Sequence, residues 1–329
     1  LQTATVTQAG DENGSTVTQS GSENDATLLQ GGFGNASTIT QANSLNIADV
    51  EQDGDDNTST VTQNGSNASA ITAQINVGNT STVTQGGTGG AGAGEFSSVD
   101  QSGSNNTATV DQFDDGTTLF GHSSTIDQSG DDNTAIVDQF DGLSSNAGGE
   151  VSTITQSGNN NLADVQQRNF SDSSSVTQSS DGNIANIDQG NGSHAGGGFV
   201  TNSFSTVIQS GTGGHTATLN NGGYKLLANS YIEQQGGTNT ATVQQGGSNA
   251  DSDIIQTGSG NTATTGQGAI DSFTSSNDVA FVEQIGDGNI STVSQDNGSS
   301  NSLATVTQSG NLGQSTITQT GDTNMATLD

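Results

Sequence analysis

A single short repeat runs through the whole chain. Its unit reads (Ser/Ala)-x-(apolar)-x-Gln, and it occurs 27 times in 329 residues. Ser or Ala stands two residues before every centre, Gln stands two residues after 24 of the 27, and Asn stands four residues before 15. Units this short cannot bury an apolar face alone, so they indicate a stacked solenoid. The centres are residues 6, 17, 28, 39, 50, 61, 71, 83, 99, 110, 126, 137, 154, 165, 176, 187, 207, 219, 232, 243, 254, 265, 282, 293, 306, 317 and 328.

The spacing inside the unit predicts β-strands. All the slots are separated by even steps, and residues at even steps along a strand lie on one face. Ser15, Val17 and Gln19 are therefore expected to face the interior, while Thr16 and Thr18 face outward. The spacings of three and four residues that mark an amphipathic helix are not sustained anywhere. The sequence predicts an all-β chain.

The connections between units alternate in length. From an odd-numbered unit to the next even one, the centres are 11 residues apart in 11 of 13 cases and 12 apart in the other two. From an even unit to the next odd one, the spacing is 11 in only five of 13 cases and otherwise ranges from 10 to 20. This asymmetry predicts a two-armed β-solenoid of about 13.5 coils, with variable loops along one edge. The Gly-rich segments 86–94 and 190–198 fall on that edge, and residues 1–329 are expected to form one domain.

Composition narrows the function. The chain is 27% hydrophobic, carries a formal net charge of -32 and has only two strong cations, Arg168 and Lys225. Such values alone would suggest disorder, but disorder does not explain alternating connection lengths. Nucleic acid is not an expected partner, because two cationic side chains cannot neutralise a row of phosphates. No apolar run approaches the ~18 residues of a membrane span, so no membrane insertion is expected.

Five segments carry a longer motif, Gln-x-Gly-x-x-Asn-x-Ala-x-x-x-Gln. Identical amides stacked at strand spacing, ~4.8 Å, can pass hydrogen bonds along a column, as in steric zippers. We expect its amide side chains to form such structural ladders between two sheets. They are Gln101, Asn106, Gln112, Gln128, Asn133, Gln139, Gln156, Asn161, Gln167, Gln234, Asn239, Gln245, Gln256, Asn261 and Gln267.

This motif resembles the curlin repeat of the curli major subunit, although the chain has many more units than that subunit. The slot six residues before the first Gln is Ser in the family; here it holds Ser more rarely than Asn, and also holds Glu95, His122, Glu150 and Asp172. The resemblance implies a secreted structural subunit of an extracellular amyloid fibre, in a biofilm matrix and in surface adhesion. The resemblance also implies that the chain's main partner is another copy of itself, in a head-to-tail homopolymer. A nucleator subunit and an outer-membrane export pore are the other implied partners.

Chemistry at a catalytic or metal site is not indicated. His122 and His215 occupy inward slots and His194 lies in a Gly-rich segment, so no catalytic constellation can be assembled from them. We expect no cofactor and no catalytic residue. Acidic turns, at residues 53–56, 114–115 and 131–132, present oxygen ligands of the kind that Ca²⁺ prefers. They are interpreted mainly as a solubilising edge, with no metal site assigned.

Two other functions stay open. Outward Thr-x-Thr pairs on consecutive even units, residues 16–18, 38–40, 60–62 and 82–84, form an array of the kind that ice-binding solenoids use. A monomeric adhesin is the second alternative. Solenoids that stay monomeric need atypical capping units, and the first and last units here are ordinary ones. We therefore expect end-to-end polymerisation.

Overall fold

The computed structural model describes residues 1–86, 94–113, 121–140, 149–168, 171–190, 202–222, 227–246, 248–268, 277–295 and 300–329. Within these ranges the regular secondary structure is entirely β, with 27 strands and no helix. The chain divides into two compact units, Leu1–Ala163 and Asp164–Asp329.

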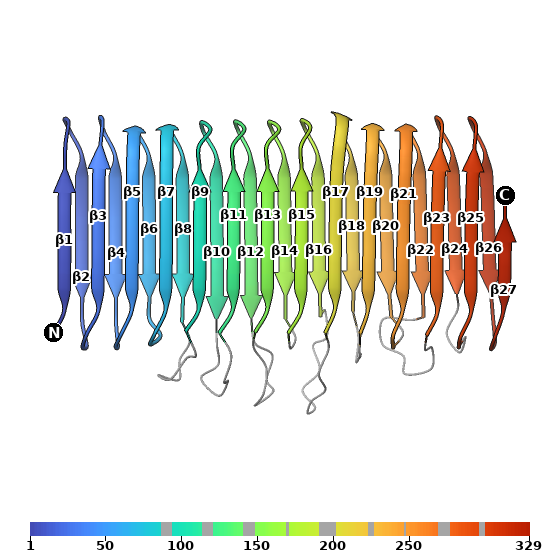
Figure 1. The fold of residues 1–329 in the computed structure, drawn as a ribbon, viewed down its shortest axis with the longest axis horizontal. Coiled ribbons are helices and arrows are strands. Elements are labelled where there is room, and N and C mark those ends of the chain that lie inside the picture. The colour runs from blue at the N-terminus through green and yellow to red at the C-terminus, as the bar shows by residue number, and fades with distance from the viewer. Residues whose placement is uncertain are drawn as a thin grey trace. The chain divides into compact units, whose positions relative to one another are not determined.

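In the first unit, odd and even strands belong to different sheets. The odd strands pair in parallel in the order β1-β3-β5-β7-β9-β11-β13, and the even strands in the order β2-β4-β6-β8-β10-β12. Figure 1 shows the odd strands running in one direction and the even strands in the other. The strands are β1 (Thr3–Gln8), β2 (Gly14–Gln19), β3 (Asp25–Gly31), β4 (Ala36–Gln41), β5 (Ile47–Asp55), β6 (Thr58–Gln63), β7 (Ser69–Val77), β8 (Thr80–Gln85), β9 (Phe96–Gln101), β10 (Thr107–Phe113), β11 (Ser123–Gln128), β12 (Thr134–Phe140) and β13 (Val151–Gln156).

The second unit repeats this plan. Its odd strands pair in parallel in the order β15-β17-β19-β21-β23-β25-β27, and its even strands from β16 to β26 do the same. The remaining strands are β14 (Leu162–Gln167), which starts at the end of the first unit, β15 (Ser173–Gln178), β16 (Ile184–Gln189), β17 (Phe204–Gly213), β18 (Thr216–Asn221), β19 (Asn229–Gly237), β20 (Thr240–Gln245), β21 (Asp251–Ser259), β22 (Thr262–Gln267), β23 (Val279–Ile285), β24 (Ile290–Gln295), β25 (Leu303–Ser309), β26 (Gln314–Gln319) and β27 (Met325–Leu328).

The core of each unit is the layer between its two sheets. In β6, Ser59, Val61 and Gln63 are buried, whereas Thr58 and Thr60 are on the outer face. This alternation recurs along the chain because side chains of a strand point to opposite faces. The prediction of an all-β, two-armed solenoid is confirmed, and the structure adds that the strands within each sheet are parallel.

The register of β7 differs from the predicted one. Parallel pairing places Val50 of β5 beside Thr72, not beside Ile71. Thr72 is buried, and Ile71 is 40% exposed on the outer face. The choice of Ile71 as the centre of this unit was therefore wrong by one residue. The Gln74 amide decides the register, since it bonds to Gln101 in the next odd strand, and a slip of one residue would turn it outward.

The corrected register makes the connections more regular. With residue 72 as the centre, the spacings from 61 and to 83 both become 11, so 12 of 13 odd-to-even connections have this length. The exception joins β17 to β18, where the pairing of β17 with β19 shifts between Gly211 and Gly213. Every break in the described residues falls between an even strand and the next odd strand. Most of the Gly-rich segments 86–94 and 190–198 thus lie outside the described residues.

Close contact between successive turns explains why the repeat motif has glycine. A Cβ atom built on Gly103 would lie 1.8 Å from the carbonyl oxygen of Gly130, and one on Gly130 would lie 2.0 Å from that of Gly158. The turns of successive coils therefore approach so closely that no side chain fits between them. This contact accounts for the spacing Gln-x-Gly in these coils.

Candidate functional site

The glutamine slots form continuous ladders in the buried layer. In the odd sheet of the first unit, each Gln donates from Nε2 to Oε1 of the Gln in the next coil, over 2.7–2.8 Å. In the even sheet the corresponding distances are 2.8–2.9 Å. The odd ladder comprises Gln8, Gln30, Gln52, Gln74, Gln101, Gln128 and Gln156, and the even ladder comprises Gln19, Gln41, Gln63, Gln85, Gln112 and Gln139.

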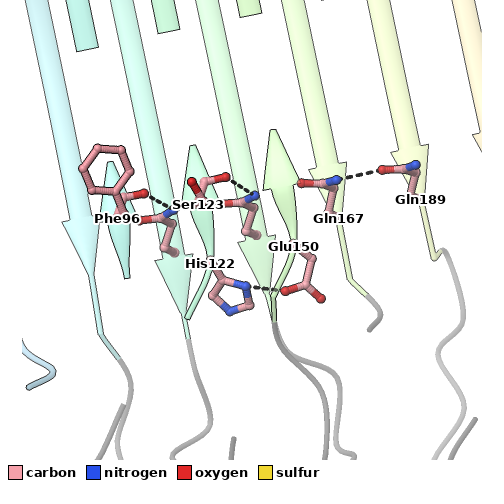
Figure 2. Close-up of polar contacts among 8 residues, drawn as sticks. Phe96, His122, Ser123, Glu150, Gln167 and Gln189 are labelled. Carbon is pink, nitrogen blue, oxygen red and sulfur yellow. Dashed lines mark hydrogen bonds and ion pairs between the residues drawn. The ribbon is translucent and has the colours of Figure 1, made fainter. Parts of the chain in front are cut away.

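The same amides tie the two sheets together. Gln112 of the even sheet donates its second N–H to the carbonyl oxygen of Phe96 in the odd sheet, over 2.9 Å. Gln139 does so to Ser123, over 3.0 Å, and Figure 2 shows both carbonyl groups receiving these bonds. Each interior Gln thus satisfies both of its donors. A buried amide is tolerated on this condition.

The asparagine slots serve the turns. Asn79 donates from Nδ2 to the carbonyl oxygen of Ile75, four residues earlier, and to that of Gly103 in the next coil, both over 2.7 Å. Its Oδ1 accepts the backbone N–H of Asn106, the equivalent residue one coil on, over 2.9 Å. Asn35 and Asn46 make the same pair of Nδ2 contacts, so an Asn in this slot can close its own turn and position the next one.

The second unit contains the same ladders with one interruption. The odd ladder runs through Gln178, Gln209, Gln234, Gln256, Gln284 and Gln308 with Nε2–Oε1 distances of 2.8–2.9 Å. In the even sheet, Asn221 replaces a Gln and is one methylene shorter. Ser205 and Ser230 bridge this place, since Asn221 donates to the Ser205 hydroxyl and accepts from that of Ser230. The even ladder then continues from Gln245 to Gln267, over 3.0 Å.

The structure places all fifteen predicted ladder residues in the buried layer, with side chains no more than 2% exposed. Ten of them are Gln, and each donates a hydrogen bond, either along its ladder or across to the facing sheet. They are Gln101, Gln112, Gln128, Gln139, Gln156, Gln167, Gln234, Gln245, Gln256 and Gln267. The other five occupy the turn-closing slot: Asn106, Asn133, Asn161, Asn239 and Asn261.

Asn occupies this slot only after a tight connection, although three odd strands that follow a tight connection have Ala68, Asp172 or Ala250 there instead. Of the 13 even strands, 11 have Asn there, and even strands follow the tight connection. Seven odd strands follow a spacing of 13 or more, and none has Asn; their residues are Glu95, His122, Glu150, Ser203, Ala228, Asp278 and Ser302. Only a tight turn brings the carbonyl group four residues back within reach of Nδ2. A longer loop removes this function and frees the slot for other residues.

His215 is the informative exception in the even strands. Its turn is one residue longer, and Nε2 lies 2.9 Å from the carbonyl oxygen of Ser210, five residues back. Nδ1 lies 3.3 Å from the backbone nitrogen of Asn239, in the role that Asn Oδ1 has elsewhere. Burial lowers the pKa of His215, against hydrogen bonds with backbone groups of Ser210 and Gly236 that raise it. A neutral ring that donates from Nε2 and accepts at Nδ1 fits both contacts.

Sequence reasoning missed one contact in the odd strands. Glu95, His122 and Glu150 occupy equivalent slots in three successive coils and are at most 1% exposed. Nδ1 of His122 forms an ion pair with Oε2 of Glu150 (Figure 2). The signal was present, because charged residues at positions that repeat with strand pairing must stack. Asp172, in the second unit, accepts the backbone N–H of Ser203 over 2.9 Å.

Asp278, like Asp172, is buried in an inward slot, where it accepts the backbone N–H of Ser302 over 3.0 Å. Other acidic residues lie on the outer faces and in the turns. Asp100 pairs with Asp127 across β9 and β11; partial burial and then this neighbouring charge raise the pKa of Asp100. Burial and the charge of Asp138 raise the pKa of Asp111 in the same way. In the turns, Asp131 accepts the backbone N–H of Ser104 over 2.8 Å. Among described residues, no group of three His, Cys, Asp or Glu is placed to hold a metal ion; residues 114–115 and 194 lie outside them.

Comparison with known families bears on this geometry. The Curlin associated repeat family matches the chain at residues 2–31, 21–54 and 300–329. These segments match the model of the curlin-associated repeat. They contain Gln8, Gln30 and Gln52 of one ladder, so the family signature coincides with the amide columns. The predicted resemblance is confirmed, and strands of the same plan in both units are consistent with a long, multi-repeat curlin-like chain.

No curated protein shows significant similarity to the chain. In the part of the chain that the structure describes, no helix has the length and hydropathy needed to cross a membrane.

Proposed function

We propose that this curlin-repeat chain is a non-enzymatic structural subunit of an extracellular, curli-like amyloid fibre that serves a biofilm matrix and surface adhesion. The observation that carries the proposal is the directional amide ladder. Along the odd ladder of the first unit, each interior Gln donates from Nε2 toward the next coil and accepts at Oε1 from the preceding one. One side of a coil therefore complements the other side of an identical coil.

This complementarity supports head-to-tail growth. A coil from a second copy can accept the same Gln and backbone hydrogen bonds as the next coil of the same chain. A head-to-tail contact that does not close on itself generates an open filament. Identical side chains stacked in register also match the steric-zipper arrangement of amyloid.

The proposed partners follow from this role. The main partner is the chain itself, as a homopolymer. A nucleator subunit would supply a first ordered coil, because closing the first coil costs chain entropy before its ladder exists. Export through an outer-membrane pore would place the fibre at the cell surface.

The test is assembly of the purified chain. We expect unfolded chain, diluted from denaturant, to form cross-β fibres after a lag, and preformed fibres to remove the lag. Thioflavin fluorescence and electron microscopy measure the time course and the product. A folded chain that stays monomeric at high concentration would contradict the proposal and favour a monomeric adhesin.

A further inference from the structure

Four consecutive strands of the even sheet in the first unit, β2, β4, β6 and β8, have an outer face that is uncharged and almost uniform. In the next two strands of that sheet, β10 and β12, the outer face carries Asp111 and Asp138. We name the outward residues of β2, β4, β6 and β8 the threonine face. It comprises 12 residues, of which 10 are Thr and none is charged. They are Gly14, Thr16, Thr18, Ala36, Thr38, Thr40, Thr58, Thr60, Thr62, Thr80, Thr82 and Thr84.

The threonine face is a regular lattice. Thr16, Thr38, Thr60 and Thr82 are paired in register through the four strands. Hydrogen-bonded strands are ~4.8 Å apart, and alternate residues of a strand are ~6.6 Å apart. Hydroxyl and methyl groups therefore repeat in two dimensions on a surface that no side chain larger than Thr interrupts.

Strand propensity alone does not account for this face. The odd strands of the same four coils need strand-forming residues equally, yet the outer faces of β3 and β5 carry Asp25, Asp49 and Glu51. The acidic residues are thus segregated to one side of these coils. Thr is a good strand residue on both sides, so segregation of charge is the feature that needs an explanation.

The second unit shows the same segregation from β18 to β26, whereas β16 carries Asp188 on its outer face. The 15 outward residues of β18, β20, β22, β24 and β26 include nine Thr and no charged residue. The outer face of its odd sheet carries Glu233, Asp251, Asp253 and Glu283. Burial raises the pKa of Asp251, and burial together with the Asp251 charge raises the pKa of Asp253, so these carboxylates already repel one another.

Electrostatics decides which faces of two such chains can meet. Sheets that pack face to face are ~10 Å apart, and charges at 0.15 M salt are screened over ~8 Å. Two acidic faces would therefore bring carboxylates within about one screening length. Two threonine faces meet without that repulsion, and their equal spacing lets the columns of one interdigitate with those of the other.

We propose that the threonine face is a lateral docking surface for the threonine face of a second copy of this chain, so that fibres associate side by side. The inference rests on the proposed fibre function. The face of four strands, each of six residues, covers about 19 by 20 Å, or ~400 Å². A standard stable interface needs ~800 Å² from each partner, so isolated chains stay apart and repetition of the face along a fibre supplies the avidity.

The experiment compares fibres of three proteins. In T38E/T82E, the two carboxylates lie on alternate coils of the threonine face, so they are not direct neighbours of each other. The matched control, T27E/T125E, adds the same charge to outward positions of β3 and β11 in the odd sheet. At 0.15 M salt we expect wild-type and control fibres to form bundles, and T38E/T82E to give single fibres with a several-fold lower sedimented fraction at low speed. Electron microscopy measures fibre widths.

The outcomes separate this inference from the proposed function. Single fibres from all three proteins, or equal loss of bundling in both variants, overturn the docking surface and leave the fibre function intact. A wild-type chain that forms no fibres overturns both. If T38E/T82E instead bundles normally but loses an inhibition of ice recrystallisation that the wild type shows, the face binds ice and the docking surface is wrong.

Discussion

A buried glutamine in a ladder has two donors and both are used. Gln128 donates to Oε1 of Gln156 over 2.8 Å and to the carbonyl oxygen of Thr107 over 3.2 Å. A glutamate of nearly the same shape would turn both contacts into pairs of acceptors. The ladder therefore discriminates between two side chains that differ by one functional group.

We predict that Gln128→Glu destabilises the folded chain by about 3–5 kcal/mol at pH 7, the usual cost of an uncompensated buried charge. Burial would raise the pKa of the new carboxyl group above its unfolded value. Its neutral form is then favoured in the fold, so stability is highest at low pH and is lost as pH rises through that raised pKa. Urea unfolding at pH 4 and pH 7 measures the difference. Thr125→Glu, on the outer face of the same strand, is expected to stay within about 0.5 kcal/mol of wild type; an equal cost for both would show that the faces are assigned wrongly.

His215 adds a pH dependence of the opposite sign. Burial lowers its pKa in the fold, whereas an unfolded His titrates near ~6.5. The unfolded chain therefore binds the proton first, and stability contributed at this site falls as pH drops below that value. We expect this site to lower the urea midpoint at pH 5 relative to pH 7. His215→Gln has no titrating ring, so the difference between the two midpoints should be smaller in that variant. A pH response unchanged in His215→Gln would argue that the ring stays uncharged in both states.

At the scale of the element, turn length and turn-closing residue are coupled. The extra residue in the β17–β18 connection is Thr212, between the two glycines where the register shifts. Asn is too short to reach Ser210 across this turn, and His is too long for the regular one. Deleting Thr212 together with His215→Asn reproduces the regular connection of the other coils.

We predict strong non-additivity between these two changes. Each alone loses a buried hydrogen bond, at a cost of about 1–3 kcal/mol, while the double variant recovers most of that cost. A double-mutant cycle on urea midpoints measures the coupling. Additive losses would mean that the ring contributes packing only and does not close the turn.

Every complete coil contains the same pair of small residues in its core. Two residues before the centre, every complete coil has one Ser and one Ala, such as Ala48 with Ser59, or Ser124 with Ala135. The two columns exchange Ser for Ala between β7 and β9, and they exchange again between β21 and β23. Constant side-chain volume in a close-packed layer explains why both columns change together.

The hydroxyl of Ser59 is buried and makes no hydrogen bond. We predict that Ser59→Ala is neutral or stabilises by up to about 1 kcal/mol, because it removes an unsatisfied polar group. Ala48→Ser, in the same coil, adds a second hydroxyl and is expected to cost about 1–3 kcal/mol. Thermal unfolding of the two variants provides the comparison; a destabilised Ser59→Ala would show that the volume of the hydroxyl matters more than its polarity.

At the scale of the whole molecule, charge opposes assembly. The chain carries a formal charge of -32, and partial burial raises the pKa of Asp100, Asp111 and Asp188. Carboxyl groups with a raised pKa in the folded state favour that state as pH falls, because it then binds more protons than the unfolded chain.

We predict that fibre formation accelerates as pH falls from 7 toward 5, and as salt increases from 0.01 M to 0.15 M, over which the screening length shrinks from ~30 Å to ~8 Å. Lag times from thioflavin fluorescence measure both effects. Ca²⁺ and Mg²⁺ at equal ionic strength are expected to act alike. A much larger effect of Ca²⁺ would indicate specific oxygen ligands in the acidic turns, and lag times indifferent to salt and acid would place the slow step in ordering the first coil.

Much of this molecule was determined by the sequence itself. Strand positions, the inward and outward faces and the alternation of tight and variable connections all follow from a repeat whose slots are an even number of residues apart. These are local properties, since the two-residue period of a strand requires no knowledge of what the strand packs against. The ladder residues could be named in advance for the same reason.

Only the tertiary structure decided the features that depend on contacts between coils. The register of β7 follows Gln74 and not the more apolar Ile71, because a hydrogen-bonded column extends across strands. The His122–Glu150 ion pair joins residues 28 positions apart, and the reach of His215 depends on a single extra turn residue. Such contacts depend on which residues the stacking of coils brings side by side. The pattern within one unit does not determine those neighbours, because they are far apart in the sequence.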